Sequence, residues 1–284
     1  MIVLAGTVPY QTGIYVGDAR IEDDFLRIGN TPFPIERGTA AMAAACARVC
    51  RFYNLPLPFC IFGGDIADGK GTDLVFRELN NNLDRLDPDV VTLHYLLPKI
   101  AHGQPFINKI NSLPKKPQLI ADAGGMYLMK TIKQASLFDV FTPDRGELTF
   151  LADEFAPHPL YVRREIIGRM SDIDSLVTAA YRHRDAAKTL VIKGAIDYIF
   201  HDSIKMKECR DPNISAMEAV GGTGDTITGM LTAFRSRGDA DADYKALLLN
   251  RLIGQFVRCT PATQIKQFIA AIPAVLEEYE KHHP

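Results

Sequence analysis

The most informative part of the chain is the stretch VGGTGDTITGML, which spans Val220–Leu231. Small residues lead into an amphipathic pattern, and Asp225 stands at the junction. Glycines let backbone N–H groups crowd around an anion, and a following helix would add its positive end. The pattern therefore predicts a phosphate-binding turn at Gly222, Thr223 and Gly224, with Asp225 in the first turn of a helix.

Asp225 has two possible roles in this pattern. A carboxylate beside a bound phosphate is well placed to take a proton from a substrate hydroxyl. The alternative is a tight turn in which Asp225 only caps the N-terminus of the helix. Short glycine-rich patterns occur in many proteins that bind no phosphate, so this stretch alone leaves both interpretations open.

The bulk composition is that of a globular protein. The chain has 284 residues, of which 47% are hydrophobic and 23% are charged. No repeat or interdomain linker is evident, so we expect a single domain over residues 1–284. The formal net charge is -2, without a long basic run, which argues against a nucleic-acid partner.

The cysteines and the N-terminus bear on the compartment. Five cysteines with no zinc-ligand spacing suggest a reducing, cytoplasmic setting, and Cys46 and Cys50 lie in an alanine-rich helical pattern that predicts apolar packing. The first residues read as a strand rather than a signal peptide. No stretch approaches the roughly 18 apolar residues of a membrane span, so no membrane association is expected.

Short apolar runs alternate with longer helical patterns along most of the chain. This order predicts an α/β fold with a mainly parallel sheet and helices on both faces. Residues 1–37 differ and predict one strand that joins the sheet plus a small β excursion, and Asp197–Lys207 predicts a hairpin. The expected buried strands are Phe59–Phe62, Val90–Leu93, Leu119–Ala121, Val140–Thr142 and Leu190–Ile192. The expected helices are Thr39–Phe52, Thr72–Leu86, Met126–Ala135, Arg145–Glu154 and Thr223–Arg235. The chain from Thr223 to its end is expected to be mostly helical, with a polar break between two helices at Gly238–Asp243.

Polar residues at strand ends matter most, because ligands bind there in open α/β sheets. In the loop Gly63–Gly71, glycines permit close approach to a ligand, and Asp65 and Asp68 can accept hydrogen bonds from substrate hydroxyls; the alternative is a loop with solvated charges. Asp122 follows the strand Leu119–Ala121. It either orients a substrate or a metal-bound water, or caps the next helix.

Two further strand ends carry charged residues. Asp144 and Glu147 are three apart, so on a helix they share a face, where two carboxylates near phosphates suit Mg²⁺ held largely through water. The alternative is a capping box at the start of that helix. Lys193 ends a buried strand, where it either meets a phosphate or marks the rim of the sheet.

The order of these sites resembles the ribokinase-like superfamily. The resemblance is carried by Gly64–Gly71, Asp122, Thr142–Glu147, Leu190–Gly194 and Gly222–Gly229, across about two-thirds of the chain. It implies a three-layer α/β/α fold around a central, mainly parallel sheet.

The resemblance also implies roles for individual residues. The Gly-Thr-Gly-Asp stretch at Gly222 forms an anion hole in such families, and its aspartate, here Asp225, is the catalytic base. Glu147 matches the glutamate of the family's Asn-x-x-Glu motif, which supports Mg²⁺ and phosphate. Asp144 replaces the asparagine of that motif, and Lys193 is placed to touch phosphate.

Two branches of the superfamily compete. Ribokinase-type sugar kinases have a loop similar to Gly64–Gly71, but their N-terminal Gly-Gly-x-x-x-Asn pattern is absent here. The nucleotide-dependent NAD(P)H-hydrate dehydratases resemble the chain at Thr142–Glu147, Ile192–Gly194 and Gly222–Asp225. They usually have a histidine where this chain has Asp144, and their Gly-Pro-Gly loop is not evident here, so the chain lies between the two branches.

The resemblance implies a cytoplasmic enzyme with ATP (or ADP) and Mg²⁺ as cofactors, able to form homo-oligomers. The leading hypothesis is a kinase for a small hydroxylated molecule, with Asp65, Asp68 and Asp122 at the substrate. The alternative is hydrate repair of NAD(P)H. A nucleotide-binding sensor without catalysis is a third hypothesis, against which the intact Asp225 argues.

Overall fold

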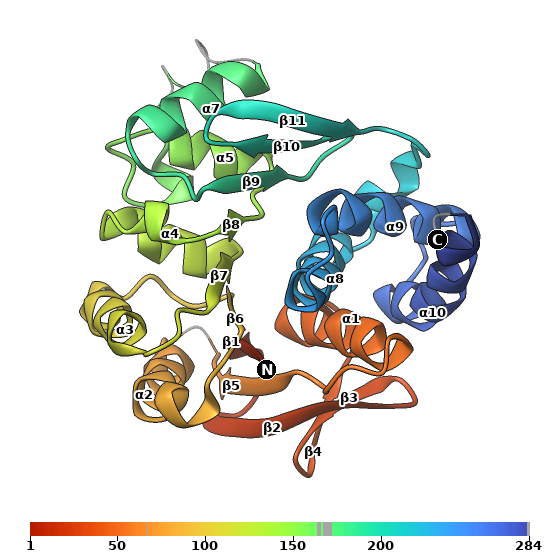
Figure 1. Cartoon of the computed structure of the whole chain (residues 1–284), viewed down its shortest axis with the longest axis horizontal. Coiled ribbons are helices and arrows are strands. Elements are labelled where there is room, and N and C mark those ends of the chain that lie inside the picture. Colours follow the sequence, from red (N-terminus) through yellow and green to blue (C-terminus); the bar gives the residue numbers. More distant parts are fainter. Residues whose placement is uncertain (67, 164–165, 167–171, 283–284) are drawn as a thin grey trace.

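The computed structural model describes residues 1–66, 68–163, 166 and 172–282 (Figure 1). Ala67, which belongs to the predicted loop Gly63–Gly71, lies outside this part of the chain. The strands are β1 Ile2–Val8, β2 Gly13–Glu22, β3 Phe25–Ile28, β4 Thr31–Pro34, β5 Phe59–Gly64, β6 Val90–His94, β7 Gln118–Ala121, β8 Val140–Phe141, β9 Thr189–Ile192, β10 Asp197–His201 and β11 Ile204–Cys209.

The strands form one sheet in the order β11-β10-β9-β8-β7-β6-β1-β5-β2-β3-β4. The run from β9 through β1 to β5 is parallel, and the predicted buried strands are all confirmed within it. The first half of β2, Gly13–Asp18, pairs antiparallel with β5, and its second half, Ala19–Glu22, pairs antiparallel with β3. The N-terminal excursion therefore extends the sheet. The predicted hairpin is present as β10 and β11.

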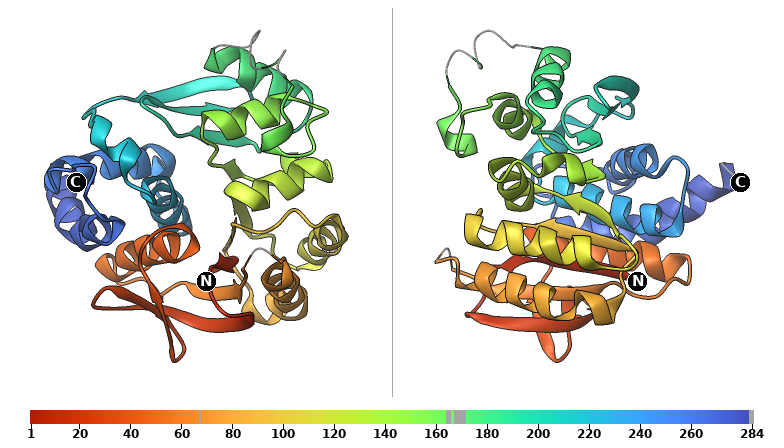
Figure 2. Two further views of the ribbon diagram at one scale, coloured as in Figure 1. Left: turned by 180° about the vertical axis from the view of Figure 1, so that it is seen from behind. Right: turned by 60° about the vertical axis from the view of Figure 1, so that its left-hand side comes forward.

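Helices cover both faces of the sheet, as predicted. Figure 1 shows α2, α3 and α4 on one side of the strands and α1, α8, α9 and α10 on the other, and Figure 2 gives the same arrangement from behind. The helices are α1 Gly38–Phe52, α2 Lys70–Leu86, α3 Ile100–Ser112, α4 Ala123–Thr131, α5 Arg145–Ala152, α7 Ile173–Arg182, α8 Thr223–Arg237, α9 Ala242–Phe256 and α10 Ile265–His282, with a short 3₁₀ helix η3 at Ser215–Ala219.

The central strands are buried on both faces, which explains their unbroken apolar sequences. Along β1, Leu4 packs into the core beneath α1 and α8, whereas Val3 and Ala5 pack into the core beneath α2 to α5. This alternation follows from the two-residue period of a strand. The molecule is therefore a three-layer α/β/α fold with one core on each side of the sheet.

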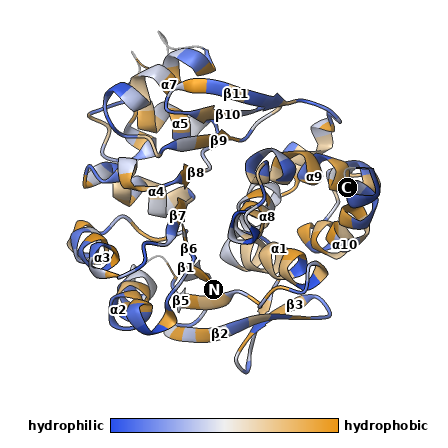
Figure 3. Cartoon of the chain, in the orientation of Figure 1, coloured by the Kyte–Doolittle hydropathy of each residue, from blue (hydrophilic) through white to orange (hydrophobic). Residues whose placement is uncertain are grey.

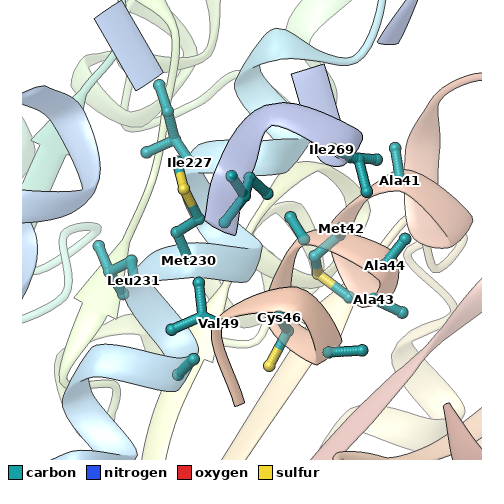
Figure 4. Packing of buried hydrophobic residues seen from close by; sticks show 14 of the residues in the cluster. Ala41, Met42, Ala43, Ala44, Cys46, Val49, Ile227, Met230, Leu231 and Ile269 are labelled. Carbon is teal, nitrogen blue, oxygen red and sulfur yellow. The ribbon is translucent and has the colours of Figure 1, made fainter. Parts of the chain in front are cut away.

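The helices α1 and α8 approach each other unusually closely. A Cβ atom at Gly229 would lie only 2.1 Å from the carbonyl oxygen of Met42, so only glycine fits there. The two cysteines of α1, Cys46 and Cys50, are buried free thiols in this contact, in agreement with the predicted apolar packing. Figure 4 shows the side chains that meet, Met42, Cys46 and Val49 from α1 and Ile227, Met230 and Leu231 from α8.

Two of the helices in the described part of the chain were not predicted, and α4 is displaced toward the N-terminus. The two helices that were not predicted are α3 and α7. The helix α3 contains Pro105, a residue that sequence patterns treat as a helix breaker. The helix α4 begins at Ala123, three residues before the expected start at Met126.

The edge strand β11 is almost entirely exposed, and Figure 3 shows both hydrophilic and hydrophobic segments along it. Its lysines, Lys205 and Lys207, protect an open edge against pairing with other chains. Among the helices described, none combines the length and the apolar character that crossing a membrane requires.

Candidate active site

A cavity of about 430 Å³ opens beyond the carboxyl ends of β6 to β9, next to the N-terminus of α8. The chain runs from β1 to β5 on one side and then returns to β6 on the other, so the sheet reverses its winding at β1. Ligands bind at such reversal points in open α/β sheets. Five of the charged residues predicted from the sequence line this cavity, namely Asp122, Asp144, Glu147, Lys193 and Asp225.

The N-terminus of α8 presents unpaired amides to the cavity. Gly222 precedes the helix with a φ of +104°, and a Cβ there would lie 2.8 Å from a side-chain carbon of Ile265. The first bond into the helix runs from the amide of Thr226 to the carbonyl of Gly222. The amides of Thr223, Gly224 and Asp225 precede that bond, so they have no partner within the helix and remain available to an anion.

Asp225 lies in the first turn of α8, as predicted, and is only 8% exposed. Its Oδ2 accepts a hydrogen bond of 2.6 Å from the amide of Gly38, and its Oδ1 lies 3.1 Å from Nε2 of His94. Burial on its own raises the pKa of Asp225, but the hydrogen bond and the charge of His94 outweigh burial and lower it. The carboxylate is thus held ionised in a partly closed site.

Asp122 is the most heavily bonded of the site carboxylates. It caps α4 by accepting from the amide of Ala123 at 2.8 Å, and it accepts from Thr228 at 2.7 Å. Lys193 donates to both its oxygens, at 3.0 and 2.9 Å. Burial lowers the pKa of Lys193, but Asp122 and Glu147 outweigh burial and raise it. Lys193 is therefore a fixed positive charge at the cavity wall.

Asp144 and Glu147 form the capping box that was the alternative interpretation of their spacing. Glu147 accepts from the amide of Asp144 at 2.9 Å, and Asp144 accepts from the amide of Glu147 at 2.8 Å. Tyr127 donates a further bond of 2.6 Å to Glu147. Burial and the neighbouring Asp122 raise the pKa of Glu147 to about 7. The capping box does not exclude a metal role, because both side chains line the cavity.

The structure does not bring Asp65 and Asp68 to this cavity. Asp65 accepts bonds from the amides of Asp68, Gly69 and Thr72 at 3.0, 3.1 and 3.3 Å, so its oxygens hold the loop before α2. Asp68 pairs with Lys70 at 2.8 Å. Neither aspartate lines the cavity around Asp225, and neither is part of the site proposed below.

His94 was missed by the sequence analysis. It directly follows the predicted strand Val90–Leu93, so the rule applied to the other strand ends would have found it. The next residue, Tyr95, lines the cavity and has a φ of +49°, and Ala123, which follows Asp122, has a φ of +42°. Such left-handed conformations in residues other than glycine are costly and concentrate at functional sites. Exposed Arg37 also lines the cavity, on the side of Tyr95 and Gly222.

Comparisons of sequence relate the chain to known proteins. A family model described as NAD(P)H-hydrate dehydratase matches residues 74–265. This range includes every site residue above except those before α2. An uncharacterized protein of Methanocaldococcus jannaschii is 38% identical over 242 residues, which are 83% of this chain and 98% of that protein.

Comparisons of structure find a ribokinase-like protein and two kinases among the similar folds. A ribokinase-like superfamily protein from Enterococcus faecalis matches with a TM-score of 0.57 at 16% identity, over 98% of this chain and 87% of that chain. The hydroxyethylthiazole kinase of Pyrococcus horikoshii gives 0.51 at 18% identity, over 82% of each chain. The tetrameric inhibited form of Escherichia coli phosphofructokinase-2 gives 0.53 at 12% identity, over 97% of this chain and 99% of that one.

At these identities the structural likeness concerns the fold, whereas the family match rests on sequence. The chain belongs to the family described as NAD(P)H-hydrate dehydratase, and it shares its fold with a ribokinase-like protein.

Proposed function

We propose that the protein is an enzyme that transfers a phosphoryl group from ATP to a hydroxyl group of a small molecule, with Asp225 as the base. One observation carries the proposal. The carboxylate of Asp225 stands beside the unpaired amides at the start of α8, inside the cavity. A base and an anion hole in one place are the two parts that phosphoryl transfer to a hydroxyl requires.

In this mechanism the acceptor hydroxyl gives its proton to Asp225 while its oxygen bonds to the γ-phosphorus. The bond from that phosphorus to the bridging oxygen breaks, and ADP leaves with the electron pair. The amides of Thr223, Gly224 and Asp225 stabilise the charge on the transferred group. Lys193 adds a positive charge within reach of the phosphates, because its ammonium group faces the cavity beside Gly224.

Asp144 and Glu147 suit a magnesium ion. Both offer oxygen ligands at the cavity, and Mg²⁺ binds proteins through one or two carboxylates and keeps several waters. Burial and the neighbouring Asp122 raise the pKa of Glu147, and a divalent cation bound there would favour its ionised form. Bound there, Mg²⁺ would neutralise charge on the nucleotide phosphates.

The acceptor is expected to be small. One cavity of about 430 Å³ has to hold the phosphates and the acceptor, and its lining includes Arg37, Tyr95, Ile214 and Asn250. This volume lies within the range of single-ligand pockets.

The family match favours a second candidate, the nucleotide-dependent dehydration of NAD(P)H hydrate. That reaction starts with the same phosphorylation of a hydroxyl and continues with loss of phosphate. An acceptor of the size of NAD(P)H would have to extend beyond the cavity.

An acceptor panel separates the two candidates. The full chain is assayed with ATP or ADP and Mg²⁺ against sugars, nucleosides, vitamin precursors and NAD(P)H hydrate. Kinase action gives a phosphorylated acceptor, and hydrate repair restores the nicotinamide absorbance. ATP binding by calorimetry, without turnover of any acceptor, would refute both and favour a nucleotide sensor.

A further inference from the structure

His94 lies beneath the cavity, fully buried at the end of β6. Its Nδ1 lies 3.1 Å from the hydroxyl oxygen of Thr39, on α1. Its Nε2 lies 3.1 Å from Asp225, on α8, and 3.7 Å from Asp122, at the end of β7. The ring of Tyr95 packs edge-on against it, with centroids 4.5 Å apart.

Thr39 determines the state of Nδ1. Its hydroxyl lies 2.6 Å from the carbonyl oxygen of Thr7, which can only accept a hydrogen bond. The single hydroxyl hydrogen of Thr39 is therefore committed to Thr7. The oxygen of Thr39 can only accept from the imidazole, so Nδ1 of His94 carries a proton.

Asp225 determines the state of Nε2. An ionised carboxylate offers only acceptors, so an unprotonated Nε2 would direct its lone pair at an anionic oxygen 3.1 Å away. The neutral tautomer with its proton on Nε2 has the same defect at Thr39. Beside an ionised Asp225, only the imidazolium, protonated on both nitrogens, satisfies both contacts.

The charges of the cluster balance in this state. Asp225 and Asp122 supply two negative charges, and Lys193 supplies one positive charge through its bonds to Asp122. Buried charges are tolerated only when they are paired and hydrogen-bonded, so a second positive charge is required. We propose that His94 is a buried imidazolium, a positioning residue that keeps Asp225 ionised and oriented toward the cavity. Its effect on turnover rests on the proposed function, but its protonation state does not.

The same three donors, His94, Asp122 and Asp225, lie within 4.8 Å of one another and could in principle surround a metal ion. The existing bonds argue for a proton instead. Oxygens of Asp122 already accept from Lys193 and Thr228, and the ammonium group of Lys193 would repel a cation at that position.

Nitrogen NMR tests the protonation state on the wild-type protein, and a variant is needed only to assign the signals. The full chain is labelled with ¹⁵N-histidine, and the His94 signals are assigned by their loss in His94→Gln. We expect a directly bonded hydrogen on both ring nitrogens at neutral pH. An unprotonated nitrogen would overturn the proposal, as would a stoichiometric metal ion that the purified protein retains and His94→Gln loses.

A pH profile tests the positioning role on the acceptor found above. Without the imidazolium, the pKa of Asp225 rises, so the acid limb of kcat/KM should move to higher pH in His94→Gln, with turnover reduced on the order of tenfold to a hundredfold. The matched control is His102→Gln. His102 also contacts an aspartate, Asp73 at 2.7 Å, but away from the cavity, and its loss should leave the profile unchanged.

An unshifted acid limb in a folded His94→Gln protein would contradict the positioning role. If no acceptor were phosphorylated at all, the proposed function would fail, whereas the NMR result on His94 would stand.

Discussion

Two glycine-rich junctions of this molecule look alike in sequence but differ in what occupies them. The helix α2 follows Gly69, with a φ of +77°, and α8 follows Gly222, with a φ of +104°. Before α2, Asp65 from the same loop accepts from the helix amides. Before α8, Asp225 turns instead toward Gly38 and His94.

The difference teaches what separates an anion site from a helix cap. Both junctions offer backbone amides near a left-handed glycine. At α2 the chain supplies its own anion, and at α8 it leaves the place open. Glycine content therefore identifies a junction, whereas the partner of the nearby carboxylate determines its function.

The largest expected effect comes from exchanging the two aspartates for asparagine. Asp225→Asn should lower turnover by about 10²–10⁴-fold, because the acceptor hydroxyl loses its base, while nucleotide binding survives. Asp65→Asn should leave the turnover of the folded protein unchanged. Steady-state kinetics with calorimetry of nucleotide binding measure both, and near-normal turnover in Asp225→Asn would remove it from the proposed chemistry.

Replacing the left-handed glycine of each junction by alanine should also affect the two junctions differently, with smaller effects. Gly222→Ala should lower the free energy of unfolding by about 1–3 kcal/mol, because it adds strain at positive φ to a clash with Ile265. Gly69→Ala should cost nearer 1 kcal/mol, because its Cβ meets the flexible end of Lys99. Denaturant titration measures both. Nucleotide affinity should fall only in Gly222→Ala, and equal losses in both variants would erase the distinction.

The start of α5 combines features of both junctions. Glu147 belongs to a capping box, as a residue of a structural turn does, and it also lines the cavity. Its pKa is about 7 in the folded protein against an ordinary value of 4.5, so the folded state binds more protons between these values. The free energy of unfolding of the wild type should therefore fall as the pH rises through this window.

Glu147→Gln keeps the capping box but has no such proton to lose. In metal-free buffer it should be more stable than the wild type by about 1–2 kcal/mol above pH 7, an estimate reduced for partial exposure, and equal to it below pH 4.5. Thermal unfolding across the pH range measures the difference. A constant difference at every pH would show that the Glu147 carboxyl does not titrate in this window.

The smallest expected effect concerns the stability of the junction before α2. Asp65→Asn should lower the free energy of unfolding by about 1 kcal/mol, because one acceptor for the amides before α2 is lost. Amide hydrogen exchange should then speed up at Gly69 and Thr72 and stay unchanged at the start of α8. Unchanged exchange at Gly69 and Thr72 would mean that Asp65 does not hold this loop.

Much of the architecture was predictable because its causes are local. Strands buried on both faces read as unbroken apolar runs, and Gly222 and Asp225 mark the start of α8 within a few residues. The helix α3 was not predicted from the sequence because Pro105 lies inside it, and proline usually ends or kinks a helix.

The connections within the site could not be predicted in the same way. The partners of His94 lie 55 and 131 residues away along the chain, so no local pattern records them. Asp65 and Asp225 are both aspartates near a glycine-rich helix start. Only the folded backbone shows that the carboxylate of Asp65 is already bonded to amides of its own loop.

The contact between α1 and α8 has a consequence for how the enzyme works. Gly38 and Thr39, which begin α1, and Asp225, which begins α8, hold the same small cluster, and the backbones behind them touch without room for a methyl group. Such a pair has no slack for sliding or hinging, so the two helices move as one rigid body. Any closure over a substrate would therefore leave Asp225, the proposed base, in its resting geometry. The free energy needed to align this carboxylate would be supplied during folding, before any ligand binds.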